Sequence, residues 1–326
     1  MNALVTGSNG FIGSHLVEQL IQRRYEVSCL IRKTSNLRWI RDLPVRFIYG
    51  DITDFNSLIP AVKNMDYVFH LGGVVRAKKE QEFYQANYEG TKNLLRACQQ
   101  KNPDLKKFIF VSSQAAIGPG FDKIPLNESD PPRPISIYGK SKLKAEQAVL
   151  DYRPYFPITI IRPPSVYGPR DDDILEIFKY VKLGIKPLLG MKSKYISLIH
   201  VTDLIEGIML AAESEKSTGQ IFFLANPQIY SILEFETAIA DAMNKKAITI
   251  KVPEFLIDLV ASMTELMAKI TGKIAIMNKD KALEMKQRYW LVDSMKARNE
   301  LSFLTKISLE EGIRETLLWY QQNRWL

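Results

Sequence analysis

The chain has 326 residues, of which 46% are hydrophobic and 25% are charged. This length favours one large domain and one small one, and the composition excludes a disordered chain. The formal net charge is +8, yet the 44 Lys and Arg residues are interleaved with 36 Asp and Glu residues. We therefore expect an affinity for anionic small molecules and no nucleic-acid partner.

Neither cysteine nor histidine forms a pattern that indicates a metal site. Cys29 and Cys98 lie inside apolar stretches, so both are expected to be buried free thiols. The three histidines lie far apart in the sequence: His15, His70 and His200. No metal is predicted. The N-terminal residues run directly into a glycine-rich segment without the features of a signal peptide, so a cytoplasmic location is expected.

The first residues of the chain predict a strand, a helix and a second strand. Residues 2–6 and 26–31 fit short buried strands, and residues 11–23 carry apolar side chains at helical spacing. Glycines between the first strand and the helix permit a tight turn and bring a pyrophosphate close to the helix N-terminus. Such a triplet also occurs in ordinary turns, but this position favours a dinucleotide site. Its expected residues are Gly7, Asn9, Gly10, Phe11, Ile12 and Gly13.

The alternation of strands and helices continues along the chain. Further strands are expected over 45–49, 67–71, 108–112 and 158–161, and helices around 57–63, 80–100 and 136–152. Strands without polar alternation, separated by helices, are typical of a parallel sheet that is covered on both faces. The predicted fold class is therefore α/β, a Rossmann-type doubly wound parallel sheet with a smaller, mostly helical C-terminal substrate lid.

Prolines interrupt the remainder of the chain and suggest how it is divided. Residues 1–162 are expected to form an NADP-binding Rossmann domain, to which residues 198–224 return. Residues 163–197 and 225–326 are expected to form the substrate-binding lid.

The end of the second strand indicates which nicotinamide cofactor binds. Enzymes that use NAD commonly place a carboxylate there, whereas this chain has Arg32 followed by Lys33. A guanidinium can hold a 2'-phosphate through paired hydrogen bonds, although a solvated basic loop is the alternative. NADP is therefore expected, with NAD possible. Asp51 and Ile52 are placed to meet the adenine, and Leu71, Gly72 and Gly73 lie beside the expected dinucleotide path.

Three hydroxyl and amine side chains suggest a hydride-transfer site. Tyr138 and Lys142 are four residues apart on a predicted helix and share one face. A nearby ammonium should lower the tyrosine pKa from its usual value near 10, and Ser113 could orient a substrate oxygen. A Tyr-xxx-Lys pair alone also arises by chance on exposed helices. Its position downstream of the glycine loop and of the Ser112-Ser113 pair favours catalysis.

With these residues the chain resembles the extended short-chain dehydrogenases/reductases, which include nucleotide-sugar epimerases, dihydroflavonol reductases and 3β-hydroxysteroid dehydrogenases. The resemblance covers essentially the whole chain. It rests on the glycine loop, the Tyr/Lys pair and four further segments: Asp51-Ile52, Asn87 to Thr91, Arg162 to Pro169, and His200 to Asp203. It implies that Tyr138 is the general acid/base, that Lys142 also holds the nicotinamide ribose, and that Ser113 polarises the reacting oxygen, with Ser112 as the weaker candidate. It also implies that Asn87, Ser112, Pro163 and Ser165 lie near the cofactor.

Departures from the sugar-nucleotide pattern favour a reductase or dehydrogenase that acts on a carbonyl or secondary alcohol of an apolar molecule. Gln114 and Ala115 follow Ser113, where related dehydratases have acidic residues. Ser165 and Ile196 stand where epimerases usually have asparagine and a diphosphate-binding arginine. The basic residues Arg170, Lys192 and Lys194 could substitute, so a nucleotide-sugar epimerase is the alternative. A catalytically silent NADPH-binding subunit is a third hypothesis, and the intact Tyr/Lys pair disfavours it.

Residues 254–271 predict a helix with a wide apolar face. Such a face is most often packed core or a subunit interface, and a homodimer is possible. Contact with an apolar substrate or with a membrane surface is the alternative, because the basic net charge suits anionic lipid. The expected partner is otherwise a small-molecule substrate.

Overall fold

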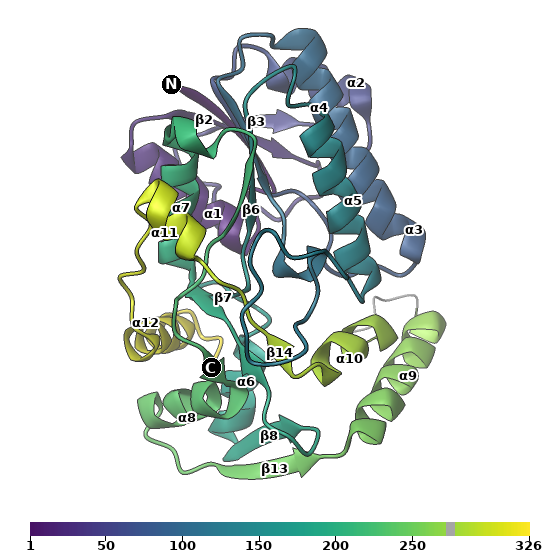
Figure 1. Ribbon diagram of the computed structural model, residues 1–326, viewed down its shortest axis with the longest axis vertical. Coiled ribbons are helices and arrows are strands. Elements are labelled where there is room, and N and C mark those ends of the chain that lie inside the picture. Colours follow the sequence, from purple (N-terminus) through teal and green to yellow (C-terminus); the bar gives the residue numbers. More distant parts are fainter. Residues whose placement is uncertain (272–277) are drawn as a thin grey trace.

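The computed structural model describes residues 1–271 and 278–326, and its upper half is built on a seven-stranded parallel sheet (Figure 1). The strand order is β11-β6-β5-β4-β1-β2-β3. The strands are β1 (Asn2–Thr6), β2 (Glu26–Ile31), β3 (Arg46–Tyr49), β4 (Tyr67–His70), β5 (Lys107–Val111), β6 (Ile158–Arg162) and β11 (Gln220–Phe223). The first six lie within one residue of the predicted positions, and the Rossmann-type α/β fold is confirmed.

Helices cover both faces of this sheet, which explains why its strands are continuous apolar runs (Figure 1). One face carries α1 (Phe11–Gln22), α7 (Val201–Glu213) and α11 (Met295–Leu301); the other carries α2 (Phe55–Val62), α4 (Gly90–Lys101) and α5 (Ile137–Asp151). Cys29 on β2 and Cys98 on α4 are buried free thiols in the cores of opposite faces, which confirms the expectation for both.

The predicted helix over 80–100 is divided into three segments. A short α3 (Glu80–Phe83) leads into a π-helical turn, η1 (Tyr84–Glu89), which continues as α4. Thr91 in the first turn of α4 donates a hydrogen bond of 2.6 Å from its Oγ1 to the carbonyl oxygen of Asn87 in η1. Apolar periodicity does not distinguish one wider turn from the α-helix on either side of it.

The remaining elements form the lid region below the sheet (Figure 1). Its helices are α6 (Leu175–Lys182), α8 (Ile232–Ala242), α9 (Glu254–Thr271), α10 (Lys279–Lys286) and α12 (Leu309–Gln322). Short strands accompany them: β8 (Ile185–Leu189) pairs with β13 (Ile248–Val252), and β9 (Tyr195–Ile196) pairs with β12 (Tyr230–Ser231) and β14 (Tyr289–Trp290). Two 3-10 turns, η2 (Gln114–Ala116) and η3 (Glu215–Ser217), lie beside the central sheet.

Two segments depart from the expected division of the chain. β10 (Leu198–His200) pairs with β7 (Ser165–Tyr167) outside the central sheet, whereas α7 and β11 join the Rossmann half. The boundaries expected from the sequence place α11 in the lid, yet Ala297 and Leu301 of this helix are buried in the core beside α1 and α7. Side-chain packing, which the proline pattern does not report, decides where this helix lies.

Candidate active site

The glycine loop joins β1 to α1 at the carboxyl edge of the sheet. A side chain at Gly13 would place its Cβ 2.1 Å from the carbonyl oxygen of Gly7, so only glycine allows this close approach of helix to loop. Gly10 caps α1 without a side-chain hydrogen bond. The backbone N–H groups of the first turn, which begins at Phe11 and Ile12, therefore point toward a position that favours an anion.

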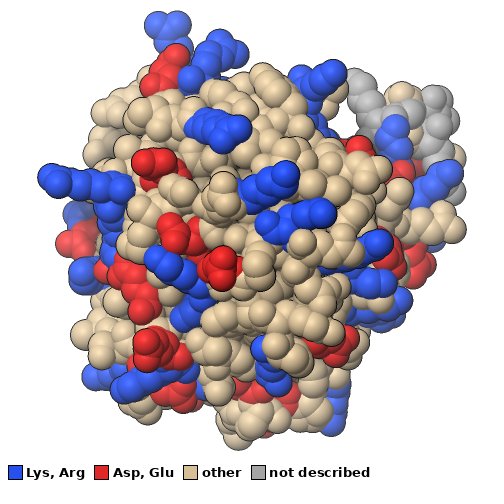
Figure 2. Space-filling model, turned by 90° about the horizontal axis from the view of Figure 1, so that it is seen from above, with Lys and Arg blue, Asp and Glu red and all other residues tan. Residues whose placement is uncertain are grey.

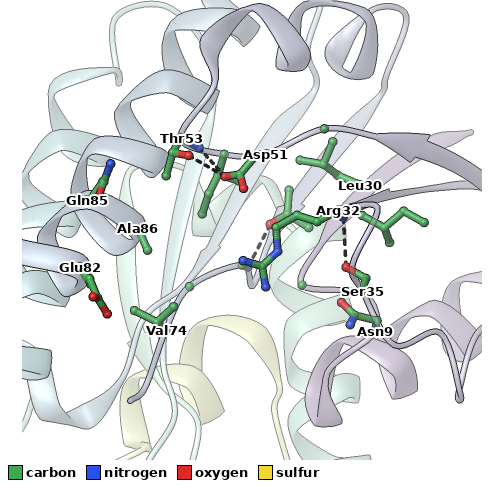
Figure 3. Close-up of a pocket in the computed structure, with 17 residues that line it drawn as sticks. Asn9, Leu30, Arg32, Ser35, Asp51, Thr53, Val74, Glu82, Gln85 and Ala86 are labelled. Atoms are coloured by element: carbon green, nitrogen blue, oxygen red, sulfur yellow. Dashed lines mark hydrogen bonds between the residues drawn. The ribbon is translucent and has the colours of Figure 1, made fainter. Parts of the chain in front are cut away.

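A cavity of about 370 Å³ opens beside this loop (Figure 3). Several predicted cofactor residues line it: Gly7, Asn9, Arg32, Asp51, Ile52, Gly72 and Gly73. The Asp51 carboxylate accepts hydrogen bonds from the backbone N–H and the hydroxyl of Thr53, at 2.9 and 2.8 Å. The Arg32 side chain extends into the cavity, as the close-up shows. Within the part of the chain that the structure describes, its guanidinium has no ion-pair partner.

Other predicted cofactor residues do not line this cavity. Lys33 is exposed beside Arg32. Asn87 is buried, and its amide group accepts a hydrogen bond from Val74 N–H and donates to Ser141 Oγ at 2.9 Å. Asn87 therefore holds the loop that follows β4.

Two further predicted cofactor residues lie near β7. Ser165 is exposed at the start of this strand, and the Pro163 carbonyl accepts a hydrogen bond of 2.8 Å from Gln114 N–H.

Sequence reasoning missed several residues that line the cavity. Ser35 accepts a hydrogen bond of 3.0 Å from the backbone N–H of Arg32, and its position three residues after Arg32 is the only sequence signal for it. Others come from strand ends and from the α3–η1 segment: Thr6, Leu30, Ile31, Gly50, Thr53, Val74, Glu82, Gln85 and Ala86. The α3–η1 residues lie far from the glycine loop in sequence, so only the fold brings them there.

These residues fit a dinucleotide. The cavity begins at an uncapped helix N-terminus, which suits a pyrophosphate, and reaches a cation and a carboxylate at the ends of β2 and β3. The glycine loop and Asn9 would hold the phosphates. Arg32 and Asp51 would face the adenosine end.

The Ser/Tyr/Lys residues meet where β5 ends and α5 begins. η2 packs against the first turn of α5, where a Cβ at Gly139 would lie 2.2 Å from the carbonyl oxygen of Ala115. Glycine at this position lets Tyr138 approach Ser113, which lies close enough to influence the pKa of the tyrosine. Ser112, in contrast, is buried and its hydroxyl has no partner among the described residues.

The electrostatic environment of Tyr138 differs from the one predicted. Burial raises its pKa to about 12, the nearby Ser113 hydroxyl opposes this shift, and the Glu284 carboxylate adds to it. The expected lowering of the tyrosine pKa by Lys142 is therefore wrong. The physical reason is that the Lys142 ammonium donates a hydrogen bond of 2.8 Å to the carbonyl oxygen of Val111 and lies 4.2 Å from the Phe110 ring centroid.

Lys142 is itself buried, with 5% of its surface exposed. Burial lowers its pKa to about 7, and the charge of Glu146 one turn along α5 opposes that shift. Glu146 also forms a buried bidentate pair with Arg162 on β6, at 2.9 and 2.6 Å. This pair fixes α5 to the neighbouring strand β6.

The lid contributes two acidic groups to this region that the sequence did not indicate. Asp280 at the start of α10 accepts hydrogen bonds of 2.8 and 2.9 Å from the backbone N–H of Ile137, the first residue of α5. Glu284, one turn further along α10, has a buried carboxylate oxygen with no hydrogen-bond partner among the described residues. α10 thus contacts the N-terminal end of the helix that carries Tyr138.

Residues 3–225 match the family described as the NAD dependent epimerase/dehydratase family. The chain belongs to this family, as its fold and site indicate, and it is an enzyme whose family uses a nicotinamide dinucleotide.

Particular relatives carry several activities. The chain is 33% identical over 263 residues, 76% of this chain and 68% of the relative, to the human sterol-4-alpha-carboxylate 3-dehydrogenase, decarboxylating. It is 25% identical to the ceramide reductase of Caulobacter vibrioides, over 99% of this chain and 95% of the relative. The structure of a UDP-glucose 4-epimerase from Thermus thermophilus in complex with NAD superimposes with a TM-score of 0.80 and 24% identity, covering 98% of this chain and 99% of the other. The last likeness concerns the fold alone.

None of the helices in the described ranges has the length and apolar character needed to cross a membrane. On the face seen in Figure 2, basic and acidic side chains are interspersed over the surface.

Proposed function

We propose that this chain is an NADP(H)-dependent oxidoreductase that interconverts a carbonyl and a secondary alcohol on a largely apolar substrate. The observation that carries the proposal is the packing of η2, which directly follows Ser113, against the first turn of α5, with buried Lys142 one turn along the same helix from Tyr138. A catalytically silent nucleotide-binding subunit would have no need for this arrangement.

In the proposed reaction the chain's own residues orient the substrate oxygen and move its proton. Ser113 and Tyr138 hydroxyls would hold that oxygen, and Tyr138 would donate its proton to it in the direction of reduction. When bound, the nicotinamide exchanges a hydride with the carbon that carries this oxygen. Because the pKa of Tyr138 is raised to about 12, the phenol carries its proton at neutral pH and has one to donate in the reductive direction.

NADP is the proposed cofactor because Arg32 extends into the adenosine end of the cavity without an ion-pair partner among the described residues. A guanidinium there would attract a 2'-phosphate. Titration of the chain with NADPH and NADH should show tighter binding of NADPH, and Arg32→Asp should remove or reverse the preference, with Lys33→Asp as the neighbouring control. Equal binding of the two nucleotides to the unmodified chain would contradict this assignment.

The apolar substrate is supported by the positions of the basic residues that could have held a diphosphate. Arg170 donates a hydrogen bond of 2.6 Å to Glu18 on α1, and the buried Lys194 ammonium bonds the carbonyl oxygen of Met285. Ile196 packs in the lid core. Of the candidates, Lys192 alone is exposed. A buried diphosphate without a cation carries a large desolvation cost. Sterol and ceramide in the names of two relatives agree with an apolar substrate.

Calorimetric titration of the NADPH-bound protein tests this choice. A panel of steroid-like and aromatic ketones should include binders, and UDP-sugars should produce no heat that depends on the identity of the sugar. Micromolar, sugar-dependent binding without any response to ketones would establish the epimerase alternative instead.

A further inference from the structure

Helix α9 has an exposed apolar surface that belongs neither to the candidate active site nor to the hydrophobic core. Of the described side chains of this helix, Ile257 and Ala261 are buried against Ala282 and Leu189. The outward side chains are larger and more numerous. This α9 stripe consists of Phe255, Leu259, Val260, Met263, Leu266 and Met267, with exposed fractions from 46% to 67%.

The acidic side chains of α9 have neighbours in the lid and do not form a continuous negative surface on this helix. Asp258 forms an ion pair with Lys286 of α10, and Glu265 accepts a hydrogen bond of 2.8 Å from the backbone N–H of Lys279. Glu254 at the start of the helix lies against Gly190 and acts on the charge of buried Lys194. Each of these carboxylates thus has a neighbour in the lid, although Glu254 and Asp258 remain exposed, and none of the three belongs to the α9 stripe.

Exposed lysines flank both ends of the α9 stripe. Lys251 precedes the helix on β13, and Lys192 lies two residues after Gly190, which is close to the first residue of α9. At the other end, Lys279 and Lys281 are exposed on α10. Figure 1 shows α9 at the periphery of the molecule, with α10 between it and the rest of the lid.

We propose that the α9 stripe rests on an anionic membrane surface, with the apolar side chains at the level of the acyl chains and the flanking lysines on the lipid phosphates. An apolar helical face with cationic ends is suited to this interface. A second copy of the chain is a poorer partner. In an antiparallel pairing of two α9 helices, the lysines at one end would face the lysines at the other, and like charges would repel.

The position of α9 gives this contact a role at the site, a step that rests on the function proposed above. α9 packs on α10, and Asp280 of α10 bonds the first N–H of the helix that carries Tyr138. Binding of α9 to a membrane would therefore place the α10 side of the active site next to the bilayer, in which an apolar ketone dissolves. The enzyme would take its substrate from the bilayer and not from water.

Sedimentation of the full chain with vesicles tests the docking itself. Binding to mixed phosphatidylcholine and phosphatidylglycerol vesicles should exceed binding to pure phosphatidylcholine by about tenfold or more. The combined variant Leu259→Ser, Met263→Ser, Leu266→Ser should lose this binding while it keeps NADPH affinity. The matched control replaces leucines elsewhere that are at least as exposed on average, Leu183→Ser, Leu304→Ser and Leu318→Ser, and should bind as the unmodified chain does.

A second variant, with Lys192, Lys251 and Lys279 changed to Gln, should lose the preference for anionic lipid without any change in the apolar stripe. Equal sedimentation with both vesicle types, or unchanged binding by the serine variant, would overturn the proposal. So would a dimer in solution that the serine changes dissociate while no vesicle binding is seen, because the stripe would then be a subunit interface.

Turnover distinguishes this inference from the proposed function. The serine variant should reduce a water-soluble ketone at the normal rate and a vesicle-dissolved ketone slowly. Equal turnover of the vesicle-dissolved ketone by variant and unmodified chain would refute delivery from the bilayer. Vesicle binding in a chain that turns over no ketone would refute the proposed function and leave the docking in place.

Discussion

At the scale of single residues, Tyr138 is the centre of the proposed chemistry. Burial raises its pKa to about 12, so it carries a proton at every physiological pH. Tyr138→Phe should lower the rate by about a hundredfold to ten-thousandfold, because the proton donor is lost and the ring is kept. Steady-state kinetics and NADPH titration on the same variant test this, and near-normal turnover would remove Tyr138 from its role.

Lys142 gives a prediction about pH and stability. Its pKa is about 7 in the folded protein and has an ordinary value of 10.5 when unfolded, so between these values the unfolded chain binds the extra proton. The free energy of unfolding should therefore rise with pH in this window, by at most about 1.4 kcal/mol per pH unit. Below pH 7 the lysine is charged in both the folded and the unfolded chain. The cost of burying its charge then lowers the free energy of unfolding in full.

Denaturant unfolding of the unmodified chain and of Lys142→Met isolates this contribution. The difference in unfolding free energy between the two proteins should shift in favour of the unmodified chain by about 1 to 2 kcal/mol between pH 7 and 9. Lys140→Met, at an exposed position of the same helix, should show no such trend. A pH-independent difference for Lys142→Met would mean that the lysine stays charged, held by Val111 and Phe110.

At the scale of elements, α5 receives its N-terminal contacts from two parts of the chain. Ser136 caps the helix in the usual way by accepting a hydrogen bond from Gly139 N–H at 3.0 Å, and Asp280 adds a carboxylate at the first turn. A carboxylate there interacts favourably with the helix dipole and with the free N–H groups.

Asp280→Ala should lower the free energy of unfolding by about 1 to 3 kcal/mol and loosen the start of α5. Hydrogen exchange of the peptide that contains Ile137 and Tyr138 should become faster, since its amide protons lose their acceptor. Asp280→Asn keeps an acceptor and should show a smaller effect. Unchanged exchange in the alanine variant would mean that α10 does not restrain the start of α5.

The elements also show which parts of the structure follow from sequence. The strands β1 to β6 and the glycine loop were predictable because buried parallel strands and a tight turn impose local residue preferences. Contacts that join distant segments were not. Asp280 lies 143 positions from Ile137, and no spacing rule connects them. The pKa of Tyr138 was predicted in the wrong direction because helical spacing fixes the side on which Lys142 lies but not the acceptor that its ammonium chooses.

At the scale of the whole molecule, the two halves are joined by aromatic contacts as well as by the chain. Three of the four tryptophans form one cluster: Trp39 after β2 lies 5.3 Å from Trp319 on α12 and 6.1 Å from Trp325, between ring centroids. α7, β11 and α11 return to the Rossmann half from within or beyond the lid. Separation of the halves would therefore expose large apolar surfaces.

We expect the halves to unfold together. Thermal transitions followed by tryptophan emission, which reports mainly this cluster, and by far-ultraviolet circular dichroism should coincide. NADPH should raise both midpoints equally, since a ligand present at a hundred times its Kd stabilises the folded state by about 2.7 kcal/mol. An emission change that precedes the loss of helix would show instead that the lid detaches first.

The two buried thiols make the opening of each face of the sheet measurable. Burial raises the pKa of Cys29 to about 11 and that of Cys98 further, and each is enclosed by the apolar core of a different face. A thiol-specific alkylating reagent can modify them only after the chain opens, because the reactive thiolate is scarce and shielded. Mass-resolved labelling rates for Cys29 and Cys98 would thus time the exposure of the α1–α7 face separately from that of the α2–α4–α5 face.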